Sequence, residues 1–88
     1  MGEPTRDVER PASELRVGRY RFFFYASDGA EPMHVHVQAG EAAAKFWLAP
    51  IRLERSRGFA RHELSRVRRL IAEHREHLMR SWNEYFKG

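Results

Sequence analysis

The chain has 88 residues, of which 42% are hydrophobic and 32% are charged, as in a single globular domain. It has no cysteine, which excludes disulfides, thiolate catalysis and cysteine-ligated zinc. Because 16 basic residues outweigh 12 acidic ones, the net charge is +4, and we expect an acidic partner such as nucleic acid or an acidic protein.

The N-terminal segment has little to bury. It holds two prolines, mixed charges and only Val8 as a sizeable apolar side chain, so we expect residues 1–14 to form a flexible tail and residues 15–88 a single domain. No apolar run approaches the ~20 residues of a membrane span, and the polar start lacks the apolar stretch of a signal peptide. We therefore expect a cytoplasmic protein with no membrane partner.

Aromatic and β-branched residues predict three strands and a short fourth one. These segments are residues 15–26, 33–38, 42–48 and 51–54. Asp28-Gly29 marks a loop, Gly40 a tight turn and Pro50 the end of the third strand. Because the connections are too short for parallel crossovers, we expect an antiparallel meander of three to four strands.

One long C-terminal helix is predicted from about residue 60 to residue 86, because apolar residues recur there every three or four positions. The stripe consists of Leu64, Val67, Ile71, His74, Leu78, Trp82 and Tyr85. We expect His74 to be a hydrogen-bonded core residue. The fold class is therefore α+β, with the sheet packed on this helix.

Strand alternation sorts the chain into two sheet faces. The apolar face holds Tyr20, Phe22, Phe24, Val35, Val37, Ala44, Phe46 and Leu48, and we expect the helix to pack there. The opposite face, called the outer face below, holds Arg19, Arg21, Phe23, Tyr25, His34, His36, Gln38, Lys45 and Trp47. Since no other segment is expected to cover its aromatic residues, this face is typical of an interaction site.

His34 and His36 lie on the same side of one predicted strand, with Cα atoms about 6.5–7 Å apart. They could act as a catalytic acid and base in phosphodiester cleavage, because imidazole titrates near neutral pH. They could instead bind a divalent metal together with a third ligand, and we expect no other cofactor. The third interpretation is that both rings pack in a partner interface.

Cations and aromatic rings alternate on the outer face in a second pattern. Arg21, Phe23, Tyr25, Lys45 and Trp47 together resemble a stacking platform for single-stranded RNA. The same residue types are favoured in protein interfaces, so a small cognate protein or a second copy of the chain would fit equally well.

An ordered set of motifs resembles the bacterial domain of unknown function 4160 family over about residues 18–86. The motifs are Tyr20–Ser27, Glu31-Pro32, His34–Val37, Ala44–Pro50, Arg57-Gly58-Phe59, Glu63-Leu64, His74-Arg75-Glu76 and Trp82–Phe86. The resemblance implies a small cytoplasmic bacterial protein, often encoded beside another small protein in a toxin–antitoxin-like arrangement. It implies no mechanism. Ala60 departs from the pattern where a serine would cap the helix.

Our leading hypothesis is a component of a toxin–antitoxin-like module that binds a partner protein or RNA through the outer face. One alternative is a small ribonuclease that uses His34 and His36 as acid and base or as metal ligands. The other alternative is a structural homodimer domain without a ligand.

Overall fold

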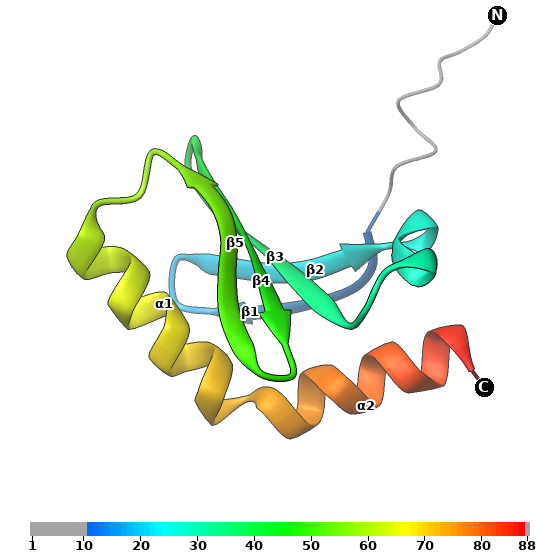
Figure 1. Cartoon of the computed structure of the whole chain (residues 1–88). Helices are drawn as coiled ribbons and strands as arrows, with labels where there is room; N and C mark the ends of the chain where they lie inside the picture. Colours follow the sequence, from blue (N-terminus) through cyan, green and yellow to red (C-terminus); the bar gives the residue numbers. More distant parts are fainter. Residues whose placement is uncertain (1–10, 88) are drawn as a thin grey trace, which may run out of the picture.

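The computed structural model describes residues 11–87 and shows an antiparallel sheet with helices on one side (Figure 1). In chain order the elements are β1 (Pro11–Val17), β2 (Tyr20–Tyr25), the 3-10 helix η2 (Ala26–Ala30), β3 (His34–Ala39), β4 (Ala42–Leu48), β5 (Ile51–Arg57), α1 (Arg61–Glu73) and α2 (Arg75–Phe86). The sheet order is β1-β2-β3-β4-β5, so every strand pairs with its neighbour in sequence. The predicted α+β meander is confirmed, but its details differ.

The prediction of three to four strands is wrong, because the segment predicted as one strand over 15–26 forms two. Val17 pairs with Tyr20 across a two-residue turn of Gly18 and Arg19. Gly18 has a φ of 60°, a conformation that glycine adopts without the Cβ clash of other residues, so the chain can reverse there. Residues 11–14, expected in the tail, belong to β1. The rest of the predicted tail, residues 1–10, lies outside the described residues.

The fourth predicted strand is longer than expected and is the fifth in the sheet. β5 continues to Arg57, three residues past the predicted end at Glu54. Gly58 then ends the strand with a φ of 82°, and a Cβ at this position would lie 2.9 Å from the Cα of Ala42. This close approach of two backbones fixes where the strand turns toward the helices.

The prediction of one long helix is also wrong, because α1 and α2 are separated at His74. His74 leaves the helical region at φ −108° and ψ 16°, and Arg75 donates from Nε to the Leu48 carbonyl at 2.8 Å. This hydrogen bond ties the junction to the end of β4. Ala60 is the N-cap of α1. It forms no side-chain capping hydrogen bond, as expected for a residue without a side-chain oxygen.

The core lies between the helices and the apolar sheet face, as predicted. All eight residues assigned to this face are buried. Seven of them form one cluster with Val67, Ile71 and Leu78 of the helices. The eighth, Phe24, packs against Trp82, with ring centroids 5.3 Å apart. His74, expected in the core, is only half-buried at the helix junction.

Neither helix within residues 11–87 combines the length and the apolar character that a membrane crossing requires.

Candidate functional site

The central strands bring most of the outer-face residues together. β3 pairs His34 with Trp47 and His36 with Lys45 on β4, and Phe23 of β2 lies opposite His36. The His36 ring lies 5.5 Å from the Phe23 ring and 5.0 Å from the Tyr25 ring. Six of the predicted site residues therefore lie together in one group of contacting side chains.

The two predicted arginines behave differently. Arg21 remains on the outer face, where its Nη1 donates to Gln38 Oε1 at 2.7 Å and its guanidinium lies 4.4 Å from the Phe23 ring centroid. Arg19 lies in the β1–β2 turn and donates from Nη1 to Glu63 of α1 at 2.7 Å. This contact directs Arg19 toward the helix layer, so it does not join the other residues of the outer face.

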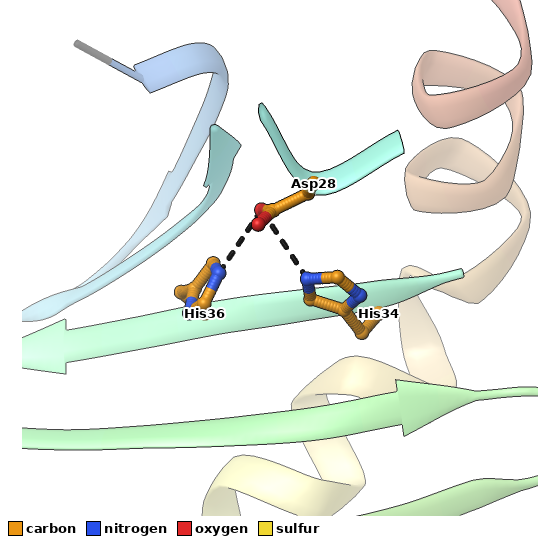
Figure 2. Close-up of side chains that lie close together, drawn as sticks. All are labelled: Asp28, His34 and His36. Atoms are coloured by element: carbon orange, nitrogen blue, oxygen red, sulfur yellow. Dashed lines mark hydrogen bonds and ion pairs between the residues drawn. The ribbon is translucent and has the colours of Figure 1, made fainter. Parts of the chain in front are cut away.

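The expectation that no segment covers the outer face is wrong, because η2 folds over the end of it (Figure 1). His34 is fully buried, and Phe23 and Lys45 are buried as well. Figure 2 shows Asp28 of η2 pointing down between the two histidines of β3. The histidine pair is therefore a three-residue cluster with a carboxylate at its centre.

One oxygen atom of Asp28 holds this cluster together. Asp28 Oδ2 accepts a hydrogen bond from the Tyr25 backbone N–H at 2.8 Å, at the start of η2. The same oxygen lies 3.0 Å from His36 Nε2 and 3.2 Å from His34 Nε2 (Figure 2). Both imidazoles therefore present their Nε2 atoms to a single carboxylate oxygen.

His34 is held in one orientation by its other nitrogen. Its Nδ1 lies 2.9 Å from the Pro32 carbonyl oxygen and must be the donor, because a carbonyl can only accept. In the neutral ring this leaves Nε2 with a lone pair and no proton. Nε2 is within ion-pair distance of Asp28 but lacks hydrogen-bond geometry, so this buried atom has no hydrogen-bond partner among the described residues.

The charges around the cluster follow from burial and pairing. Burial lowers the pKa of His36, although the nearby Asp28 carboxylate acts in the opposite direction. Beside it, Lys45 Nζ lies 2.6 Å from Glu31 Oε1, and this hydrogen bond lowers the pKa of Glu31. His36 therefore favours its neutral form, in which Nε2 can either donate or accept.

Two hollows lie next to the cluster on the outer face of β4 and β5. The first, of about 240 Å³, is lined by side chains that include His36, Lys45, Arg55 and Arg57. The second, of about 510 Å³, is more apolar and is lined by Pro32, Met33, Trp47, Ala49, Pro50, Arg52 and Glu54. The outer face thus offers a basic hollow and an aromatic one side by side.

Arg55 and Arg57 were not assigned from the sequence because the predicted strand ended at Glu54, and β5 also contains a bulge there. Strict alternation would put Arg55 on the face opposite Arg52. The pairing instead shifts between Leu53 and Arg55, so Arg52 lies opposite Trp47 and Arg55 lies opposite Lys45. Asp28 was missed for another reason, since Asp28-Gly29 indicates only a turn in the sequence.

A family model described as Domain of unknown function (DUF4160) matches residues 20–83. This range includes the aromatic strand β2, the whole Asp28–His34–His36 cluster and both hollows. No curated protein and no solved structure matches the chain.

Proposed function

Because this chain belongs to the DUF4160 family, whose description names no activity, we propose a function from its own surface: it binds single-stranded RNA on the outer face of β4 and β5. The observation that carries the proposal is the pair of adjacent hollows, one lined by cations and the other by an aromatic ring. Single-strand binders combine these two features, cations along the backbone path and rings on which bases stack.

The basic hollow suits a phosphate group. Arg55 and Arg57 are exposed, and the Arg57 guanidinium donates to the Glu41 carbonyl at 3.1 Å, which leaves further N–H groups available. Lys45 is paired with Glu31 at 2.6 Å, so its charge is largely compensated. Arg55 makes only a longer, exposed ion pair of 3.9 Å with Glu54, so the two arginines supply most of the positive charge. Arginine also matches the geometry of phosphate oxygens through bidentate hydrogen bonds.

The aromatic hollow suits a base. Trp47 is half-buried, and its Nε1 donates to Glu54 Oε1 at 3.1 Å, which fixes the plane of the indole. Trp47 follows Lys45 by two residues on the same strand face, so a residue lining the basic hollow and one lining the aromatic hollow have Cα atoms about 6.5–7 Å apart along β4. One RNA strand can therefore place a phosphate in the basic hollow and a neighbouring base in the aromatic hollow.

The proposal is tested by fluorescence anisotropy with a labelled single-stranded RNA and a salt series. The double variant Arg55→Ala/Arg57→Ala should bind more weakly, and its plot of log K against log salt should be shallower by about 1.4, from two lost contacts of about 0.7 each. Trp47→Leu should lose about 1–3 kcal/mol of stacking with little change in slope.

The matched control is Arg61→Ala/Arg80→Ala, which removes the same charge from the helix layer, where both residues are exposed. If this control loses as much affinity as Arg55→Ala/Arg57→Ala, binding follows net charge, and the proposed surface is wrong. Double-stranded RNA of the same length should bind less tightly, because its bases are not free to stack on Trp47.

The ribonuclease alternative is checked on the same RNA by electrophoresis. His34 is fully buried, and only His36 lines the basic hollow, so the two histidines are not both placed to touch a bound strand. We therefore expect intact RNA after incubation. Cleavage that disappears in His36→Gln would instead favour an enzyme.

A protein partner is a second candidate, favoured by the edge of the sheet. β5 is an edge strand, Arg52–Arg57 are exposed, and Leu53 presents 40% of its surface. Exposed edge strands accept an added strand from a partner. We propose that such a partner is a small cognate protein in a toxin–antitoxin-like module, as the family resemblance suggests.

This candidate is tested by co-purification with the protein encoded beside this chain, using wild type and Leu53→Lys. Loss of the complex in the variant would support pairing through β5, and an unchanged complex would contradict it. Sedimentation of the isolated chain distinguishes the homodimer, which Leu53→Lys should dissociate.

A further inference from the structure

We propose that Asp28, His34 and His36 form a binding site for one divalent first-row transition-metal ion, with zinc as the expected occupant. The proposal is independent of RNA binding and rests on the interior of the cluster, not on the hollows beside it. Two imidazoles and one carboxylate are a ligand set that suits such ions, and zinc in particular.

The three ligand atoms already have a suitable spacing. One ligand atom from each residue lies within 4.8 Å of the other two. Asp28 Oδ2 is 3.0 Å from His36 Nε2 and 3.2 Å from His34 Nε2. Ligands bound at 2.0–2.1 Å to a tetrahedral zinc ion lie about 3.3 Å from one another. Side-chain movements of less than an ångström would therefore accommodate the ion.

The buried Nε2 of His34 is an independent indication of a cation. The nitrogen lies 3.2 Å from Asp28 Oδ2 without hydrogen-bond geometry, and the residue has no exposure to solvent. Two acceptors in this position repel each other, and burial makes an unpartnered polar atom costly. A metal ion between them would satisfy both atoms.

The surroundings of His34 match those of a metal-bound histidine. Metal-binding imidazoles almost always donate their second N–H to a carbonyl or carboxylate, which fixes the tautomer. His34 does this from Nδ1 to the Pro32 carbonyl at 2.9 Å. The ring is also enclosed by Trp47 and Trp82, whose centroids lie 5.7 Å and 5.1 Å from it. The ring of His34 is thus held in one orientation, with Nε2 3.2 Å from Asp28 Oδ2.

The cluster is partly exposed through two of its three side chains. The side chain of His34 has no exposure, whereas those of Asp28 and His36 are 14% and 18% exposed. An ion can therefore enter from the side of His36, which also borders the basic hollow. Three protein ligands and one open position are the arrangement of zinc sites that exchange a water or a ligand.

The rival explanation is a protonated His34 that forms a buried ion pair with Asp28. Both explanations account for the 3.2 Å approach, but only one predicts stoichiometric metal binding. The experiment uses the full chain without a histidine tag, stripped with chelator and dialysed. Zinc binding is measured by calorimetry, and cobalt binding by its visible absorption band.

We expect one ion per chain, with micromolar or tighter affinity, and a cobalt band that zinc displaces. Asp28→Asn and His36→Gln should each weaken binding at least tenfold. The matched control is His62→Gln, an exposed histidine on α1, which should bind like wild type. Circular dichroism verifies that each variant is folded, and His36→Gln, a partly exposed position, decides the result if Asp28→Asn unfolds.

The proposal is overturned if the wild type binds zinc no more tightly than a folded His36→Gln variant, or if cobalt gives no band at a 1:1 ratio. RNA anisotropy is measured separately in the presence of chelator. Loss of RNA binding there would not affect the metal result, and absence of metal binding would not affect the proposed RNA surface.

Discussion

His34 Nε2 and Asp28 Oδ2 lie 3.2 Å apart with no hydrogen bond between them, at a position where His34 has no contact with solvent. The carboxylate belongs to the short 3-10 helix η2 and the imidazole to strand β3, so this approach joins two different elements. Substitution of Asp28 or His34 should therefore change both the affinity for a metal ion and the free energy of unfolding.

Zinc should stabilise the fold against heat. A ligand present at 100 times its Kd stabilises the native state by about 2.7 kcal/mol, because it binds the unfolded chain much less well. For a domain of this size, that corresponds to a rise in Tm of roughly 10–20 °C. Differential scanning fluorimetry with and without zinc measures the shift. It should be absent in Asp28→Asn and retained in His62→Gln.

Asp28→Ala should destabilise the metal-free protein by about 1–3 kcal/mol. The substitution leaves the Tyr25 backbone N–H and His36 Nε2 without their shared acceptor, and partly buried donors without partners are costly. Urea denaturation measures the effect. Glu41→Ala, an exposed residue in the β3–β4 turn, is the control and should change stability by less than about 0.5 kcal/mol. Equal losses in the two variants would contradict a structural role for Asp28.

The contribution of Glu31 to stability should depend on pH. The hydrogen bond from Lys45 lowers the pKa of Glu31 below its ordinary value of 4.5, so the folded state favours the ionised carboxylate. The resulting stabilisation is therefore fully present above pH 4.5 and is lost as the pH falls through the lower folded-state pKa. The stability difference between wild type and Glu31→Gln should be largest near neutral pH and shrink toward pH 3.

Urea denaturation at several pH values provides this difference directly. Glu73→Gln, an exposed position at the end of α1, serves as the control. A difference for Glu31 that grows on acidification would show that the Lys45 pairing does not contribute in the expected direction.

Gly29→Ala should destabilise the protein, although such a change often stabilises a chain by restricting its unfolded state. A Cβ at Gly29 would lie 2.6 Å and 2.8 Å from two ring carbons of Phe86, so the Phe86 ring would have to leave its place against η2, or η2 and α2 would have to separate. In the Phe86→Leu background the same substitution should be nearly neutral. Urea denaturation of the four variants gives the coupling, and a coupling energy near zero would rule out this contact as the cause.

The faces of the sheet could be predicted because β2, β3 and β4 follow strict alternation. Phe22, Val37 and Ala44 lie on the buried face in register, and Phe23, His36 and Lys45 lie on the opposite one. Alternation requires no knowledge of the tertiary structure. It fails in β5, where one extra residue near Glu54 moves Arg55 to the outer face.

The cluster could be predicted only in part, because its third member comes from a different element. His34 and His36 are separated by one residue on a strand, and their shared face follows from the sequence. Asp28 reaches them because η2 folds back over β3, and the packing of Gly29 against Phe86 holds η2 there. Local patterns do not specify such a return of the chain.

The break between α1 and α2 at His74 could not be predicted from the sequence pattern either. The apolar spacing continues in phase from Ile71 to Leu78, and residues 70–78 contain no proline or glycine that would indicate an interruption. The junction is instead fixed by the contact of Arg75 with the Leu48 carbonyl, which joins residues 27 positions apart in the chain.

The enclosure of His34 gives the protein a built-in optical reporter. The chain has two tryptophans, and both indoles flank this imidazole, one from β4 and one from α2. Tryptophan fluorescence, excited at the red edge of the protein's absorption spectrum, therefore originates entirely from indoles beside the cluster. Unlabelled collections of metals, nucleotides or peptides can be screened against it directly, and only events near His34 will alter the signal strongly.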